Sequence, residues 1–274
     1  MIGQCALCQQ QKPLRRSHLV PAAVYKLVRK LDTGEHDLVH VGRRVSVASS
    51  LEIRAHLLCT ECEQRFHENG ESYTLKNCFR GLGDFPLREV LVRSGQPCIF
   101  PEATMYATRG VAGVETGKLV YFAASVFWRS SVGRWKHRDH RINIADLGPF
   151  QEDFRLYLLG KRHFPSAAVM LINISSREQP TFNAFTFPYG CRVGTYHQFS
   201  FNIPGIDFHL LVGKRIPEAF YNDCCHHSPE QYVGFMDNDE CFFRPMLELL
   251  RNSKPVGKLG ESIRQMGPRD KAGR

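Results

Sequence analysis

The chain has 274 residues, of which 43% are hydrophobic and 23% are charged. This is enough for one large domain or two ordinary ones, and it excludes a disulfide mini-protein, a collagen-like fibre and a wholly disordered chain. Lysine and arginine number 36 against 27 aspartate and glutamate, which gives a formal charge of +9. That balance is compatible with an anionic partner but names none. The ten cysteines are the more specific lead.

The sequence predicts a cytoplasmic protein. Its first residues lack the apolar stretch of a signal peptide, and no window reaches the roughly 18 apolar residues that a membrane span needs. Thiols stay reduced inside cells, so paired cysteines there favour metal ligation over disulfides. We therefore expect no membrane partner and look for a metal site among the cysteines.

Composition divides the chain into four segments of an expected α+β protein. Residues 1–80 form a zinc-stabilised unit, and residues 81–118, rich in glycine and proline, form a connector. Residues 119–250 mix helix and strand patterns, which predicts a larger domain of helices and mostly antiparallel sheet. Residues 251–274 carry seven basic and two acidic residues and are expected to be a disordered tail.

The periodicity of apolar residues predicts the individual elements in chain order. The spacing predicts a helix over 22–31 and a strand or hairpin over 39–47. Later helices are expected over 71–80, 119–130 and 150–159, and later strands over 167–174, 181–187, 198–203 and 206–212. The pair Pro204-Gly205 between the last two strands predicts a hairpin turn.

Four of the cysteines have the spacing of a zinc site. Cys5 and Cys8 form one C-x2-C pair, and Cys59 and Cys62 form a second. Zinc takes four thiolate or imidazole ligands in a tetrahedron, and each such pair places two sulfurs on one tight turn. Four protein ligands leave no open position for chemistry. The predicted zinc is therefore structural and supplies folding free energy to a unit with a thin core.

The residues around these cysteines resemble those of HNH endonucleases. The segment Ser17-His18-Leu19-Val20-Pro21 follows the first pair, Leu57-Leu58 precedes the second, and Glu63 and Phe66 come after it. The resemblance covers residues 1 to about 70. It implies a ββα-metal nuclease on a treble-clef zinc scaffold, which hydrolyses phosphodiester bonds of DNA or RNA. DNA is the favoured substrate.

The resemblance also implies roles for individual residues. Phosphodiester hydrolysis needs a base that activates water and a divalent cation that neutralises phosphate charge. By this resemblance, His18 stands at the position of the family's general base, and Glu63 at the position of its metal ligand on the helix. His67, four residues later, would face the same site and help to hold catalytic Mg2+ or Mn2+. The Asn that orients the base in this family is missing, and Arg54 stands in its place, where it would grip a phosphate.

Three functions stay open at this point. The favoured one is a metal-dependent nuclease, for which the resemblance suggests a setting in bacterial defence. The second is an inactive zinc-containing module that binds nucleic acid or a protein, because the orienting Asn is absent. The third is a regulatory protein whose second domain senses a small ligand. That domain could also carry a protein partner or a homo-oligomer contact.

Two basic clusters are candidate contacts for nucleic acid, and each has an ordinary alternative. The first cluster surrounds His18 and comprises Lys12, Arg15, Arg16, Lys26, Arg29 and Lys30. It would neutralise phosphates or form a solvated helix face. The second is the run 134–141, in which Trp135 could stack on a base or lie in an exposed loop.

Overall fold

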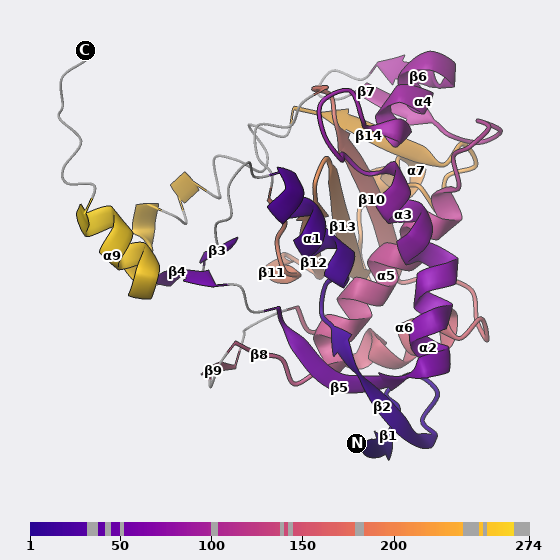
Figure 1. The fold of residues 1–274 in the computed structure, drawn as a ribbon. Coiled ribbons are helices and arrows are strands. Elements are labelled where there is room, and N and C mark those ends of the chain that lie inside the picture. Colours follow the sequence, from indigo (N-terminus) through magenta and orange to yellow (C-terminus); the bar gives the residue numbers. More distant parts are fainter. Residues whose placement is uncertain are drawn as a thin grey trace, which may run out of the picture.

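The computed structural model describes residues 1–31, 38–41, 45–49, 52–99, 104–137, 140–141, 145–178, 184–237, 247–248 and 251–265. Within these ranges the protein is α+β, as the sequence predicts. A small sheet at the N-terminus precedes a larger sheet that helices cover on one face (Figure 1). No helix in the described part of the chain is long and apolar enough to cross a membrane.

The N-terminal sheet has the cysteines at one end and His18 at the other. Its three antiparallel strands are β1 (Ile2–Gln4), β2 (Gln11–His18) and β5 (Arg54–Cys59). Leu14 pairs with Cys59, and His18 pairs with Arg54. His18 lies four positions after Leu14 in β2, a distance of about 13 Å along a strand. The strand pairing therefore links the position of His18 to the cysteine end.

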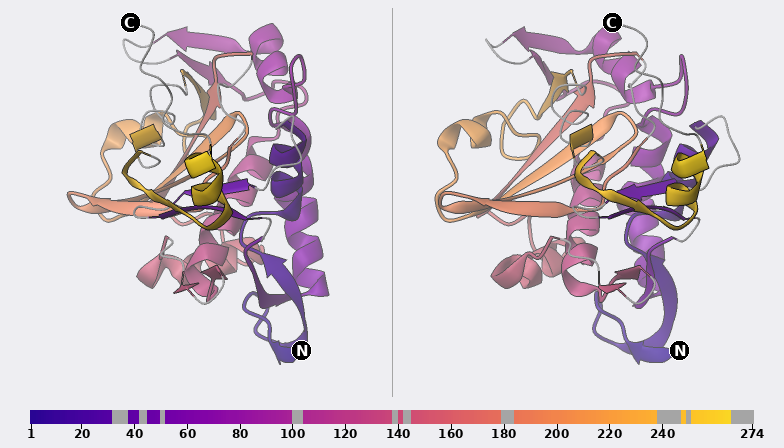
Figure 2. Two further views of the ribbon diagram at one scale, coloured as in Figure 1. Left: turned by 60° about the vertical axis from the view of Figure 1, so that its left-hand side comes forward. Right: turned by 90° about the vertical axis from the view of Figure 1, so that its left-hand side faces the viewer.

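The segment between β2 and β5 contains a helix and a hairpin. The helix α1 (Ala22–Leu31) coincides with the predicted range and buries Val24, Tyr25 and Val28. The hairpin strands β3 (Leu38–Val41) and β4 (Val45–Ser49) join β15 (Lys254–Val256) in a separate sheet, followed by α9 (Gly257–Gln265). In both views of Figure 2 the yellow C-terminal elements lie beside this hairpin.

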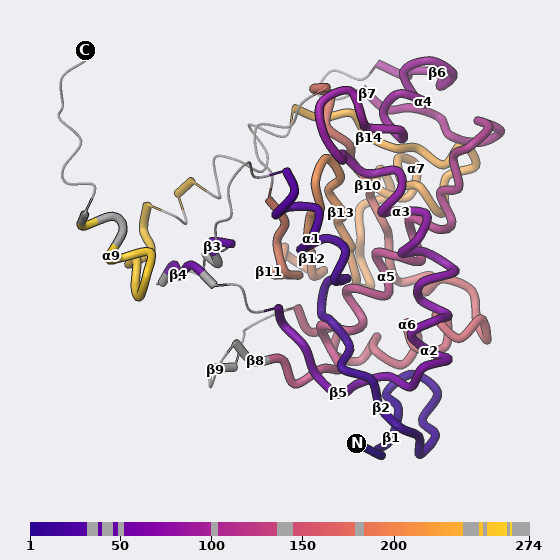
Figure 3. Tube along the Cα trace, in the orientation of Figure 1, coloured from indigo at the N-terminus to yellow at the C-terminus, as the bar shows by residue number. Residues whose placement is uncertain are grey.

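One long helical stretch leads from the N-terminal sheet to the larger domain. The chain passes from β5 directly into α2 (Thr60–Phe66), a π-helical turn (His67–Glu71) and α3 (Ser72–Asn77) (Figure 3). Gly70 in the π-helical turn faces α5 (Thr116–Val132): a Cβ built there would lie 2.7 Å from the backbone nitrogen of Phe122. Only glycine allows the two helices to approach this closely.

The larger sheet has seven strands, and all neighbours but one run antiparallel. In spatial order they are β11 (Tyr189–Val193), β12 (Tyr196–Ile203), β13 (Ile206–Gly213), β10 (Ala168–Ser175), β14 (Tyr232–Met236), β7 (Thr104–Ala107) and β6 (Gln96–Ile99). The exception is the parallel pair of β10 and β14. Residues alternate between the faces, so Phe201 and Phe208 pack against Phe122 of α5. The hairpin of β12 and β13 forms as predicted, with Ile203 opposite Ile206.

The remaining described elements lie outside these sheets and the long helical stretch. They are α4 (Pro86–Ser94), a short pair β8 (Lys136–His137) and β9 (His140–Arg141), a 3-10 turn (Gly148–Phe150), α6 (Gln151–Leu158) and α7 (Glu218–Asn222). α6 packs beside α5. Residues of α7 cover a small apolar cluster around Leu211, on the sheet face away from α5.

Three segments differ from the sequence-based expectation. The predicted connector, 81–118, supplies β6 and β7 to the edge of the large sheet. Residues 254–265, expected in a disordered tail, form β15 and α9, while 266–274 lie outside the described residues. The strand expected over 181–187 is absent from its described part, 184–187. β7 pairs with β14 and β15 pairs with β4, and these partners are distant in sequence, so local composition does not reveal the pairing.

Candidate functional site

The four predicted ligand cysteines lie together. Cys5 and Cys8 occupy the turn between β1 and β2, while Cys59 and Cys62 flank the start of α2. The sulfur atoms all lie within 4.8 Å of one another, and Cys8 Sγ lies 3.9 Å from Cys59 Sγ. A tetrahedral ion with bonds of about 2.3 Å places its sulfurs about 3.8 Å apart. The cysteines therefore fit a single metal ion with four thiolate ligands.

Backbone hydrogen bonds shape this cluster. The Cys59 N–H donates to Sγ of Cys5 at 3.3 Å, and the Ala6 N–H donates to the Leu57 carbonyl at 3.0 Å. Hydrogen bonding from the Cys62 thiol, aided by backbone N–H groups, outweighs burial and holds the pKa of Cys5 well below its usual range. The neighbouring thiols shift the other way: burial raises the pKa of Cys59 to about 11, and the hydrogen bond to Cys5 together with burial raises the pKa of Cys62. The thiolate is the form that binds metal, so a bound cation would be needed to hold all four cysteines in the ligating state.

The predicted catalytic metal ligands do not form a comparable cluster. Among the described residues, no other group of three His, Cys, Asp or Glu side chains brings its ligand atoms this close together. His67 is exposed, and Glu63 is half-buried with an Oε1 atom that has no hydrogen-bond partner in the described part of the chain. Glu63 and His67, predicted to hold the catalytic Mg2+ or Mn2+, therefore do not belong to a cluster of three ligand groups in the described part of the chain.

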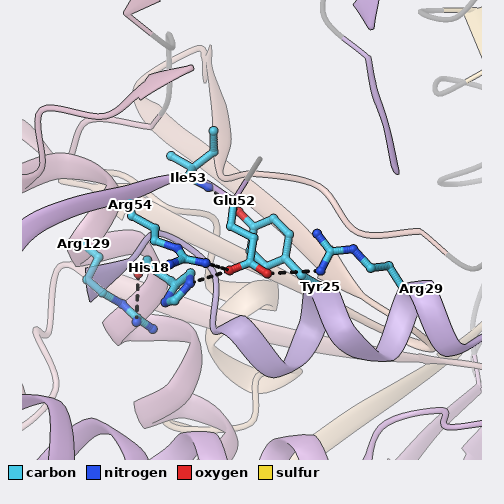
Figure 4. Close-up of polar contacts among 7 residues, drawn as sticks. All are labelled: His18, Tyr25, Arg29, Glu52, Ile53, Arg54 and Arg129. Carbon is cyan, nitrogen blue, oxygen red and sulfur yellow. Dashed lines mark hydrogen bonds and ion pairs between the residues drawn. The ribbon is translucent and has the colours of Figure 1, made fainter. Parts of the chain in front are cut away.

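His18 instead contacts Glu52, a residue that the sequence reasoning did not single out. Nε2 of His18 lies 2.8 Å from Oε2 of Glu52. The same oxygen accepts a hydrogen bond from Arg54 at 2.5 Å, and Oε1 accepts one from Arg29 at 3.2 Å (Figure 4). We call His18, Arg29, Glu52 and Arg54 the Glu52 cluster. Burial opposes ionisation of Glu52, but the hydrogen bonds from His18, Arg54 and Arg29 outweigh it and hold its pKa below the ordinary value.

Three secondary-structure elements, β2, β5 and α1, bring the Glu52 cluster together. Strand pairing sets His18 opposite Arg54, and α1 supplies Arg29. Glu52 lies two residues before Arg54, a spacing that puts both side chains on one face of extended chain. Tyr25 accepts a hydrogen bond from the Ile53 N–H at 3.2 Å and fixes this segment. In the sequence, the only sign of this contact is the spacing of two between the acidic Glu52 and the basic Arg54.

Arg129 of α5 supports the backbone of His18 from the larger domain. Its guanidinium donates to the His18 carbonyl at 3.2 Å and to Oε1 of Glu71 at 2.8 Å. Its charge also lies 5.4 Å from the ring centre of Phe66. The side chain is 1% exposed. The site residue His18 is therefore anchored by an interior ion pair that joins the two parts of the fold.

The second basic cluster differs from what the sequence suggested, while both expectations for the first stay open. Trp135 is buried, and its indole N–H donates to the Arg129 carbonyl at 2.8 Å, so in this fold it neither stacks on a base nor lies in an exposed loop. In the first cluster, Lys12 pairs with Glu61 at 3.0 Å. Arg29 of that cluster belongs to the Glu52 cluster.

Comparison with protein-family models, with curated proteins and with solved structures found no match to this chain. The resemblance to HNH endonucleases therefore rests on the motif residues. The cysteine cluster is compatible with the zinc unit of that resemblance.

Proposed function

We propose that the N-terminal unit is a zinc-stabilised, HNH-like nuclease that hydrolyses phosphodiester bonds, with DNA as the favoured substrate. The contact between His18 and Glu52 carries this proposal. An ionised carboxylate only accepts hydrogen bonds, so Nε2 of the ring holds the proton and Nδ1 is the nitrogen that can take one from water. Glu52 thereby supplies the orienting contact that the missing Asn provides in the family.

The role of the metal cluster follows from its ligands and its position. Four thiolates favour zinc, and a closed tetrahedron makes it a structural ion. It would fix the cysteine end of β2 and β5 together with the start of α2. The paired strands then hold His18 and Arg54 in register at their other end.

The arginines of the Glu52 cluster suit a phosphate. The side chains of Arg54 and Arg29 are 37% and 33% exposed, so both can meet a ligand from solvent while they contact Glu52. Guanidinium groups bind phosphate oxygens through paired N–H donors. In this proposal they position the phosphodiester beside His18.

A second candidate is a zinc-containing nucleic-acid-binding or protein-interaction module without catalysis. One observation favours it: Glu52 already engages both arginines. In that case the Glu52 cluster only stabilises the fold. Salt-sensitive binding without cleavage would be its signature.

Cleavage assays separate the two candidates. Purified protein of measured zinc content is incubated with plasmid DNA and with RNA, in Mg2+, in Mn2+ and in EDTA. We expect His18→Ala to lower the cleavage rate by about 10²–10⁴-fold, the usual contribution of a general base. His197→Ala, an exposed histidine of β12, is the matched control. Equal products from the wild type and His18→Ala would overturn the catalytic assignment. Glu63→Ala tests the predicted metal ligand in the same assay.

A further inference from the structure

The face of the large sheet that points away from α5 carries a row of polar residues. The strand register places Asp207 of β13 between Asn173 of β10 and Asn202 of β12. The neighbouring row places His209 opposite Ser200. Because side chains alternate along a strand, all five share one face, while Phe201 and Phe208 point to α5. A polar row inside an otherwise apolar sheet needs an explanation.

These residues line a cavity of about 230 Å³. Phe220 of α7 and Tyr189 of β11 contribute aromatic walls to it. Gly234 of β14 makes room for the polar row, since a Cβ there would lie 2.2 Å from Oδ1 of Asn173. The volume suits a ligand of nucleobase size better than an extended one.

Two neighbouring side chains in the cavity have oxygen atoms with no hydrogen-bond partner among the described residues: the buried amide oxygen of Asn202, and the carboxyl of Asp207, which keeps some contact with solvent. The Asn202 amide N–H donates to the Ala184 carbonyl at 3.3 Å, but its Oδ1 is buried and has no partner among the described residues. Asp207 is 7% exposed, and no hydrogen bond to its carboxyl occurs within the described ranges. Buried polar atoms are paired in most folded proteins, because an unpaired one costs about 1–3 kcal/mol. A ligand that donates hydrogen bonds would satisfy both.

The charges in the cavity also favour a ligand that donates hydrogen bonds. No lysine or arginine is among the described residues that line it. Burial raises the pKa of Asp207 to about 7 and lowers the pKa of His209 to about 4. The imidazole is therefore neutral at pH 7, and Nδ1 is engaged with the Ser200 hydroxyl at 2.8 Å. Asp207 has no cationic partner in the described lining.

We propose that this cavity binds a small molecule bearing a guanidine group, whose adjacent N–H donors meet Asp207 and Asn202. Guanidine occurs in two sources of suitable size: within the ring of guanine, and as the head group of arginine-like amines. Both present an N–H beside an NH2, which pairs with a carboxylate through two parallel hydrogen bonds. The aromatic walls would contact the flat face of the group. The site lies in the larger domain, so the proposal is independent of the proposed nuclease activity.

Calorimetric titration of the full chain tests this proposal. The probes are guanosine, arginine and agmatine, and their comparators are inosine, which lacks the 2-amino group, and citrulline, which lacks the guanidinium. We expect at least one probe to bind, and its comparator to bind at least tenfold more weakly. Binding by guanosine alone would identify a base as the source, and binding by the amines alone an arginine-like ligand. No binding by any probe at millimolar concentration would overturn the proposal.

Variants place the binding in the cavity. Asp207→Asn and Asn202→Leu should each weaken the bound probe at least tenfold, while His197→Ala, on the same strand but exposed, should bind as the wild type does. Thermal melting checks that each variant is folded. If one of the two cavity variants does not fold, the other alone is enough for the test. Unchanged affinity in a folded cavity variant would place the probe elsewhere and overturn the assignment.

Discussion

Arg129 and Glu71 form an ion pair at 2.8 Å in the protein interior, and the same guanidinium holds the His18 carbonyl. Removal of one partner from a buried pair leaves the other charge uncompensated, which costs about 3–5 kcal/mol. We therefore expect Arg129→Leu to lower the free energy of unfolding by about that amount. Urea unfolding monitored by circular dichroism measures the loss.

An exposed arginine provides the control for this variant. Arg162 pairs with Asp153 at 3.0 Å, and its side chain is 62% exposed. Such a surface pair is worth about 0–1 kcal/mol, so Arg162→Ala should change stability little. A loss for Arg129→Leu no larger than that of the control would contradict the interior ion pair as an anchor of the site.

The cysteine cluster predicts how metal and stability depend on each other. Cys59→Ser removes one of four ligands, and we expect the purified variant to lose its bound ion and to melt at a lower temperature. Binding of a structural metal is coupled to folding, so a strong chelator should destabilise the wild type in the same way. Elemental analysis and thermal melting measure the two effects. Cys191→Ser is the control, because this exposed thiol lies outside the cluster. A variant Cys59→Ser with full metal content would exclude the four-cysteine site.

Local sequence patterns were enough to predict several parts of this fold. The apolar spacing over 22–31 gave the range of α1, because a helix that buries one face needs that period. The C-x2-C spacing identified the cluster of Cys5, Cys8, Cys59 and Cys62, because metal geometry restricts the sequence between ligands. Pro204-Gly205 marked the hairpin, since Gly205 adopts a φ of +78° that favours glycine.

The contacts around His18 were not predictable in this way. Arg129 reaches the His18 carbonyl across 111 residues of sequence, and Glu52 reaches the His18 ring across 34. Such contacts depend on how elements pack, which no local period encodes. The polar row of the large sheet was missed for a related reason. Asp207 lies in a strand whose other residues are mostly apolar, so the pattern indicates burial without showing the cavity that Asp207 faces.

The Glu52 cluster predicts a pH dependence of stability. The pKa of Glu52 is lower in the folded protein than in the unfolded chain, so its ionised form stabilises the fold. This contribution is fully present above the ordinary glutamate pKa of 4.5, which applies to the unfolded chain, and is lost as the pH falls through the lower folded value. Glu52→Gln should therefore be less stable than the wild type at pH 7, and the gap should narrow towards pH 3. Urea unfolding at several pH values measures the gap. A gap that stays constant across this range would show that the carboxylate charge does not stabilise the cluster.

Asp207 predicts the opposite dependence. Its pKa is about 7 in the folded protein against 3.8 for an ordinary aspartate, so the carboxyl ionises first in the unfolded chain as the pH rises. The protonated carboxyl of Asp207 is the form that suits the fold. Its contribution to the free energy of unfolding is therefore lost as the pH rises from the lower to the higher of these two values. Asp207→Asn cannot ionise, and we expect it to be more stable than the wild type at pH 8, by at most about 4 kcal/mol, with the advantage vanishing near pH 4. His209, whose pKa is lowered to about 4, titrates in the wild type and in the variant alike. Its contribution to the free energy of unfolding is therefore nearly equal in the two proteins and drops out of their difference. Urea unfolding of the two proteins at pH 4, 6 and 8 measures the advantage. An advantage independent of pH would mean that Asp207 has a partner that compensates its charge, and the cavity would then lack the unpaired carboxyl that a guanidine ligand needs.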